Sequence, residues 1–266
     1  MLETSTALLN KMLAALPAGV QRRLLPYLEL LPFGKILCES GGTMRSVYFP
    51  VNAIVSLQYV MQDGSSAEIA AVGCEGIIGI ALFMGGGSTP NQALVRSAGY
   101  AYRLLGQKFK EECNRHSELM MLLLRYTQAL FTQMSQTAVC NRHHSIVQQL
   151  CRLLLLSLDR LGGNQLVMTQ ELIANMLGVR REGVTEAAGK LYKLGIIEYS
   201  RGRITVLDRS ELERRCCECY AVVKTETDRL LPYLALPPQA LACAPGAGAP
   251  ASKKRCASGP RFCLKS

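Results

Sequence analysis

The spacing of apolar and polar residues changes along the chain, and each change predicts a different kind of structure. Up to residue 28 the apolar positions recur every three or four residues, which predicts two short helices separated at Pro17. Short apolar runs separated by glycine-rich turns then predict a small antiparallel β-roll, or jelly roll. Helical spacing returns after that. The predicted segments are helices at 1–28, a β-roll at 29–106, a long helix at 107–138, a helical and hairpin domain at 139–210, a further helix at 211–236 and a disordered basic tail at 237–266.

The helix predicted at 107–138 carries a broad apolar seam, with spacings of three and four residues. A helix of about 30 residues is about 45 Å long, and the β-roll alone cannot bury all of its apolar surface. We therefore predict that two copies of the chain pair along this helix, with packing inside one subunit as the alternative. The predicted dimerisation residues are Leu119, Leu123, Tyr126, Leu130 and Met134.

Residues 168–207 have the layout of two short helices followed by a β-hairpin. Thr169 is a suitable N-cap for the first helix, and Gly178 suits the tight turn that follows it. The second helix begins near Arg180, and two short β-type runs joined by a turn come after it. This order of elements predicts a winged helix-turn-helix.

Charged and polar side chains occupy one face of the second helix, opposite its apolar residues Val184 and Leu191. In a helix-turn-helix this face enters the major groove of DNA, where Arg bonds guanine and Glu accepts a hydrogen bond from cytosine. A solvated face on an ordinary helix pair is the alternative. The predicted DNA-contacting residues are Thr169, Gln170, Arg180, Arg181, Glu182, Thr185, Glu186, Lys190, Arg201 and Arg203.

This stretch resembles the C-terminal domain of the cyclic-AMP receptor protein/FNR family of bacterial transcription regulators. The matching positions are Thr169, Ile173, Ala174, Leu177, Gly178, Arg181, Glu182, Val184 and Thr185. The resemblance implies an α+β fold, with a cyclic-nucleotide-binding-like β-roll, a dimerisation helix and a C-terminal winged helix-turn-helix. It also implies a homodimer that binds a pseudo-palindromic operator in double-stranded DNA, with Arg181 and Glu182 reading bases and RNA polymerase as a further candidate partner. The chain departs from the family pattern at Arg180, Gly183 and Glu186, and the Glu186 carboxylate indicates a half-site sequence different from the usual one.

The same resemblance places a nucleotide-binding cassette in the β-roll, at residues 78–82 and 90–93. Family members that bind cyclic nucleotides use a glutamate for the ribose hydroxyl, and this chain has Ile80 in its place. They use an arginine for the phosphate, and this chain has Asn91. An apolar side chain cannot accept the ribose hydrogen bond, and an amide cannot neutralise a phosphate. Cyclic AMP is therefore not expected as the ligand, and the effector stays open.

The charge of the chain agrees with binding to a polyanion. The net charge is +10, and the basic excess is uneven: residues 139–210 hold ten Lys/Arg against six Asp/Glu, and residues 237–266 hold five against none. The length of 266 residues and the apolar content of 49% suffice for two domains. With no eighteen-residue apolar run and no signal-peptide pattern, a cytoplasmic protein without a membrane span is expected.

The eleven cysteines follow no regular spacing, and in the cytoplasm they are predicted to be reduced thiols. Iron–sulfur members of the family need a cluster of N-terminal cysteines, whereas Cys38 and Cys74 stand alone. The three histidines, His116, His143 and His144, form no ligand set by their spacing. These residues therefore predict neither an iron–sulfur cluster nor a haem.

A further group, Cys216-Cys217-x-Cys219, is close in sequence, but its thiols cannot all reach one metal without other ligands, and no cysteine or histidine partner is expected nearby. No metal and no cofactor are predicted. An enzyme is not expected either, because no nucleophile–base pair is visible and the glycine run at 85–87 lacks the Lys-Ser/Thr of a P-loop.

Two functions follow from these patterns. The first is a homodimeric, sequence-specific DNA-binding transcription regulator with a degenerate cyclic-nucleotide site. The second is a sensor or interaction protein that docks another protein on its winged helix. The departures at Arg180 and Glu186 favour the second function, whereas Arg181, Glu182 and the arginines of the predicted wing favour the first.

Overall fold

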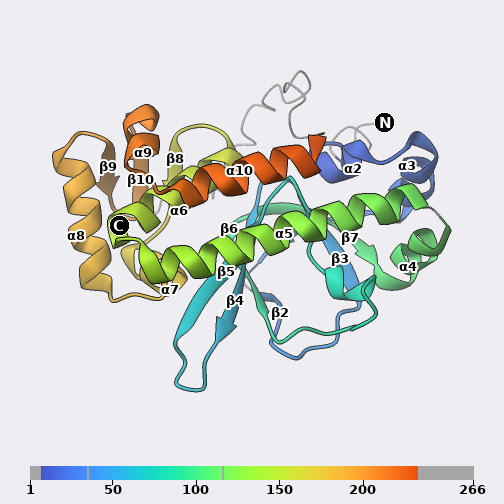
Figure 1. Cartoon of the computed structure of the whole chain (residues 1–266). Coiled ribbons are helices and arrows are strands. Elements are labelled where there is room, and N and C mark those ends of the chain that lie inside the picture. Colours follow the sequence, from blue (N-terminus) through green and yellow to red (C-terminus); the bar gives the residue numbers. More distant parts are fainter. Residues whose placement is uncertain (1–6, 35, 116, 233–266) are drawn as a thin grey trace, which may run out of the picture. The chain divides into compact units, whose positions relative to one another are not determined.

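The computed structural model describes residues 7–34, 36–115 and 117–232 (Figure 1), and the basic tail predicted at 237–266 lies outside them. Helices α2 (Lys11–Ala15) and α3 (Ala18–Leu24) lie on either side of Pro17, as predicted, and the 3-10 turn η1 (Leu25–Tyr27) follows. Asn10 is buried at the start of α2. Its side-chain oxygen accepts a hydrogen bond from the Leu13 amide, and its nitrogen donates to the carbonyls of Pro50 and Gly76 at 2.8 and 3.0 Å. This side chain joins the N-terminal helices to the β-roll.

In the described part of the β-roll, seven antiparallel strands form two sheets, which confirms the predicted architecture. The strands are β1 (Glu29–Phe33), β2 (Ile36–Cys38), β3 (Ser46–Pro50), β4 (Ile54–Val60), β5 (Ser66–Val72), β6 (Gln92–Ser97) and β7 (Gly99–Leu105). One sheet has the order β1-β7-β3 and the other β2-β6-β4-β5. Val47, Val55 and Leu104 are fully buried in the core between them. The short turn η2 (Ile80–Leu82) follows Gly79, whose φ of 106° is in the left-handed region.

The helix predicted at 107–138 is two helices, α4 (Gly106–Arg115) and α5 (Ser117–His143), and α5 continues beyond the predicted end. Helix α5 is the long green helix across the middle of Figure 1. Neither it nor any other helix in the described part of the chain is long and apolar enough to cross a membrane.

The predicted dimerisation seam faces the interior of the same chain, so this assignment was wrong. Leu119, Leu123, Tyr126 and Leu130 are at most 4% exposed and belong to the β-roll core, and Met134 is partly buried against the same core. The Tyr126 hydroxyl donates a hydrogen bond to the Ile77 carbonyl at 3.0 Å. A Cβ atom at Gly76 would lie 2.4 Å from the Tyr126 ring, so a glycine is required for this close approach. The helical period identified the apolar face correctly but did not show which surface covers it.

A different stripe of α5 is exposed. Met121, Leu124, Phe131 and Val139 have exposed fractions of 51, 50, 55 and 47%. Their spacing places them on one side of the helix, together with the exposed polar side chains of Gln128 and Ser135.

The domain after α5 has its own core. Its elements are α6 (Ile146–Leu161), β8 (Gln165–Val167), α7 (Gln170–Leu177), α8 (Arg181–Lys193), β9 (Ile197–Ser200) and β10 (Arg203–Val206). Ser145 begins α6 with a capping box that includes Gln148. Leu154, Ile173 and Leu191 are buried between the helices and the sheet of order β8-β10-β9. The predicted winged helix-turn-helix layout is confirmed.

The single helix predicted at 211–236 is instead two helices, α9 (Arg209–Arg215) and α10 (Glu218–Leu230). Cys216 and Cys217 separate them with extended backbone, with ψ angles of 157 and 163°. Helix α10 then packs along α5 (Figure 1). This packing brings Cys217 and Cys219 next to Cys140 and His144 at the end of α5, so the expectation that no cysteine or histidine lies near the Cys216–Cys219 run was wrong.

Candidate nucleic-acid interface and β-roll cavity

The turn between α7 and α8 is fixed by local interactions. The Thr169 hydroxyl accepts a hydrogen bond from the Leu172 amide at 3.1 Å, so Thr169 caps α7 as predicted. Gly178 ends the helix with φ 65° and ψ 35°, a left-handed conformation in which a side chain is strained. Helix α8 begins after Arg180, whose side chain does not cap it.

The outer face of α8 is polar and accessible. Arg181, Glu182, Thr185, Glu186 and Lys190 are all exposed or partly exposed, whereas the opposite face is buried in the domain core. The Thr185 hydroxyl lies 2.8 Å from Gln170 Oε1 and 3.0 Å from the Arg181 carbonyl, and thus connects the starts of the two helices. These five residues share the exposed face of α8.

Glu186 does not present an isolated negative charge on this face. Its carboxylate lies 2.8 Å from the Lys190 ammonium, one helical turn away. The hydrogen bond from Lys190 lowers the pKa of Glu186, so the carboxylate stays ionised and paired. The departure from the family pattern at Glu186 is therefore compensated by its neighbour on the same face.

Gly183 has a packing role that explains the second departure. A Cβ atom at this position would lie 2.7 Å from Ile146 Cδ1 at the start of α6. A serine or threonine here would require the Ile146 side chain to turn away, so glycine leaves room for the Ile146 methyl group between α6 and α8.

The hairpin of β9 and β10 places the last two predicted residues beside α7. Arg201 has φ 48° and Gly202 has φ 76°, so both central residues of the turn have positive φ, as a two-residue hairpin turn of type I′ requires. The Gly202 carbonyl accepts a hydrogen bond from the Met168 amide at 2.8 Å, which holds the hairpin near Thr169. Arg201 and Arg203 are exposed on it.

The β-roll contains a cavity of about 370 Å³ at the predicted nucleotide cassette. Ile80 and Asn91 both line it, together with apolar side chains such as Leu57, Leu130 and Met134. None of the described residues that line the cavity carries a charged side chain. The Asn91 Oδ1 atom is buried and has no hydrogen-bond partner among the described residues. The cavity suits an uncharged, largely apolar molecule that donates a hydrogen bond.

The two cysteines of the β-roll, Cys38 and Cys74, lie in surroundings that favour the protonated thiol. Burial raises the pKa of Cys38, and it raises the pKa of Cys74 to about 11. Both groups therefore stay protonated at neutral pH and are poor nucleophiles.

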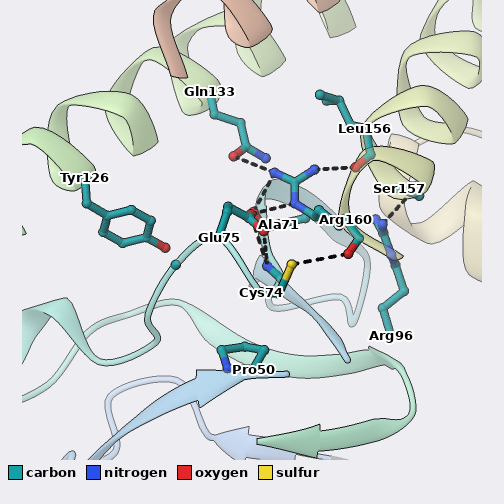
Figure 2. A network of polar contacts seen from close by, with 12 residues as sticks. Pro50, Ala71, Cys74, Glu75, Arg96, Tyr126, Gln133, Leu156, Ser157 and Arg160 are labelled. Atoms are coloured by element: carbon teal, nitrogen blue, oxygen red, sulfur yellow. Dashed lines mark hydrogen bonds and ion pairs between the residues drawn. The ribbon is translucent and has the colours of Figure 1, made fainter. Parts of the chain in front are cut away.

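A buried polar network joins the β-roll to α6 (Figure 2). Arg160 of α6 donates from Nε to Glu75 at 2.7 Å and from its Nη atoms to the carbonyls of Leu156 and Ala71 and to Gln133 of α5. The Arg160 and Glu75 side chains are only 9 and 14% exposed. Burial lowers the pKa of Arg160, but the charge and hydrogen bond of Glu75 outweigh this effect and the net shift is upward.

A second buried arginine, on a strand of the β-roll, also connects the β-roll to α6. Arg96 of β6 donates to Glu68 at 3.1 Å and to the Ser157 hydroxyl of α6 at 2.6 Å. Sequence reasoning missed this network, because its members are isolated charges in apolar segments. The one sequence feature that relates to this network is the glycine at position 73. A Cβ atom there would lie 3.0 Å from the Arg160 Cβ atom, so Gly73 allows Arg160 to approach closely.

Comparisons with known proteins show similarity in the helix-turn-helix domain and in the fold of most of the chain. Residues 148–215 match the family model of the Crp-like helix-turn-helix domain. FixK2 from Bradyrhizobium japonicum has a similar structure, with a TM-score of 0.61 and 16% identity over 71% of this chain and 98% of that chain. A transcriptional regulator of the CRP family from Thermus thermophilus has a TM-score of 0.59 and 17% identity over 70% of this chain and 95% of that chain.

The c-di-GMP responsive global regulator CLP from Xanthomonas campestris is also similar, with a TM-score of 0.58 and 14% identity over 72% of this chain and 100% of that chain. The curated proteins contain no match to the sequence. At these identities the solved structures share the fold of this chain, including both the β-roll and the helix-turn-helix.

Proposed function

Because residues 148–215 form a Crp-like helix-turn-helix domain in a chain with the fold of the Crp/Fnr transcription regulators, we propose that the protein is a homodimeric, sequence-specific DNA-binding regulator. The observation that carries this proposal is the exposed polar face of α8, flanked by the capped start of α7 and the arginine-bearing hairpin. This is the arrangement in which a recognition helix enters the major groove while a wing contacts the backbone.

The exposed residues divide into two roles. Arg181 and Glu182 lie in the first turn of α8, where side chains reach base edges. Arg201 and Arg203 lie on the hairpin, where the accessible partner is a phosphate. The paired Glu186 and Lys190 add little net charge to the face.

Substituting Arg181 and Arg203 separately is expected to give different results. Arg181→Ala should relax the preference at one base pair of each half-site by about tenfold or more, because a bidentate base contact is lost. Arg203→Ala should weaken binding to all sequences about equally and lower the salt dependence by about one per half-site. Selection from a randomised operator library at two salt concentrations measures both effects.

Arg229→Ala is the matched control, since it removes an exposed arginine from α10, away from the helix-turn-helix domain. It should change neither the selected sequence nor the salt dependence. An unchanged sequence preference for Arg181→Ala would contradict DNA reading by α8 and would favour the alternative, in which the winged helix docks a protein.

We further propose that the β-roll does not respond to cyclic nucleotides. The cavity presents Ile80 and Asn91 where a ribose and a phosphate would need charged partners, and its described lining is uncharged. Burying a phosphate there would leave it unneutralised. An uncharged, mostly apolar effector is the ligand class that this lining supports.

Titration calorimetry with cyclic AMP, and separately with cyclic di-GMP, is therefore expected to show no saturable binding. DNA affinity should be the same with and without either nucleotide. Saturable binding at one site per chain that is lost in Asn91→Leu would overturn the proposal of a degenerate nucleotide site.

The homodimer is proposed to form through the exposed stripe of α5. Met121, Leu124, Phe131 and Val139 are about half exposed although they are large and apolar. An apolar stripe along a 27-residue helix suits pairing with the same stripe of a second copy.

A further inference from the structure

Four metal-ligating side chains converge where the end of α5 meets the start of α10. Cys140 lies in the last turn of α5, and His144 directly follows the end of the helix. Because the two residues are four apart, their side chains lie on the same side of α5. Cys217 precedes the first residue of α10, and Cys219 lies in its first turn. The four ligand atoms all lie within 4.8 Å of one another. The sequence separations of 77 and 75 residues show that only the fold brings them together.

The spacing of these atoms matches a tetrahedral metal centre. Cys140 Sγ lies 3.6 Å from Cys217 Sγ, and Cys219 Sγ lies 3.6 Å from His144 Nδ1. In a tetrahedral zinc site with Zn–S of about 2.3 Å and Zn–N of about 2.0–2.1 Å, the ligand atoms are separated by about 3.5–3.8 Å. A disulfide would need a sulfur–sulfur distance of about 2.05 Å. We propose that Cys140, His144, Cys217 and Cys219 bind one Zn²⁺ ion as a Cys₃His site.

The surroundings of the four side chains support this assignment. The three cysteines are at most 5% exposed and the His144 side chain is 14% exposed, so the centre is closed to solvent. His144 Nε2 lies 3.3 Å from Glu218 Oε2, which leaves Nδ1 directed at the thiols. Zinc-bound histidines commonly donate a hydrogen bond from their second ring nitrogen to a carboxylate, and the carboxylate fixes the orientation of the ring.

The local charge also favours thiolates. Arg152 is buried beside the cluster, its Nη1 donates to Thr137 at 3.1 Å, and its Nε has no hydrogen-bond partner among the described residues. Three thiolates and Zn²⁺ carry one net negative charge, which the Arg152 guanidinium balances. Three protons leave the thiols when the ion binds.

The proposed ion has a structural consequence. Four protein ligands leave no open position, as in structural rather than catalytic zinc sites. His144 immediately precedes Ser145, the cap of α6, so the ion would fix the connection between α5 and the helix-turn-helix domain. It would also hold α10 against α5. Thiolate and imidazole ligands in this geometry favour zinc over magnesium or calcium.

Metal analysis of the full-length chain, purified under reducing conditions, tests the site directly. We expect about one zinc per chain in the wild type and almost none in Cys217→Ser and Cys219→Ser. Two variants control for other thiols. Cys151→Ala removes a buried cysteine outside the cluster, and the triple serine variant of Cys243, Cys256 and Cys263 removes those of the tail. Both should keep the zinc.

Cobalt titration of the wild type keeps the test decisive even when a serine variant fails to fold. Co²⁺ should give thiolate charge-transfer bands and the intense visible bands of a tetrahedral ion, and His144→Cys should keep the metal with shifted bands. The proposal is overturned if the wild type contains no zinc and gives no such bands. It is equally overturned if Cys217→Ser and Cys219→Ser retain the full zinc content, or if mass mapping of the reduced preparation shows a Cys140–Cys217 disulfide.

Discussion

Replacing Leu124 and Phe131 together by lysine is expected to convert the dimer into monomers and to weaken binding to a complete operator by about 100- to 10,000-fold. Both side chains are about half exposed on the exposed stripe of α5, so the change should not disturb the core of one subunit. Two lysines on each copy would place four like charges in an apolar contact, where they repel one another and lose their hydration. Each helix-turn-helix would then bind its half-site without help from a linked partner.

Sedimentation equilibrium gives the oligomeric state, and fluorescence anisotropy with full and half operators gives the affinities. Tyr59→Lys together with Met61→Lys is the matched control, because these side chains are similarly exposed near the β4–β5 turn and the charge added is the same. The control should remain dimeric with unchanged affinity. If the Leu124 and Phe131 variant still sediments as a dimer, the subunits pair through another surface.

The sequence indicated the helix-turn-helix accurately because its signals are local. Thr169 caps a helix that begins one residue later, and Gly178 adopts the left-handed turn expected of it. Each of these features depends on neighbours within a few residues, so the pattern of residue types determines it. The strand spacing of the β-roll similarly follows from alternating burial and glycine turns.

The surface proposed for dimerisation could not be predicted in the same way. Leu123 and Leu124 are adjacent in sequence, and both are apolar, but one is fully buried and the other is half exposed. The period of α5 shows that an apolar face exists, yet two apolar faces meet on this helix and only tertiary packing assigns one to the β-roll. The hydrogen bond of Tyr126 to Ile77 and its contact with Gly76 hold this side chain against the β-roll. The spacing of apolar residues along the helix cannot predict either contact.

The cysteine cluster was missed for a related reason. Cys217 and Cys219 are close together in the sequence. Their partners are far away along the chain: Cys140 is 77 residues from Cys217, and His144 is 75 residues from Cys219. Their approach depends on α10 folding back along α5 after the break at Cys216. The spacing of four residues between Cys140 and His144 was the available signal, since it places two ligands on one helical face.

Removing the Arg160 side chain is expected to destabilise the protein by about 3–5 kcal/mol, because Arg160→Met leaves the Glu75 carboxylate buried without its main counter-charge. The carbonyl of Ala71 and the amide oxygen of Gln133 lose a donor in the same change. Urea unfolding at one fixed protein concentration measures the loss, since the stability of a dimer depends on concentration. Arg229→Met, which breaks an exposed pair with Glu226, should show no measurable change.

The double variant Arg160→Met with Glu75→Gln separates the charge from the packing. Glutamine keeps an acceptor for the Gly73 amide, which bonds Glu75 at 3.1 Å, but it needs no counter-ion. Most of the lost stability should therefore return, because a neutral buried group costs far less than a buried charge that has lost its main counter-charge. If the double variant is as unstable as Arg160→Met alone, the lost hydrogen bonds to Ala71 and Gln133 dominate instead. Since Arg160 belongs to α6 and Glu75 to the β-roll, the single variant should also release the helix-turn-helix domain, which limited proteolysis near residue 144 would detect as faster cleavage.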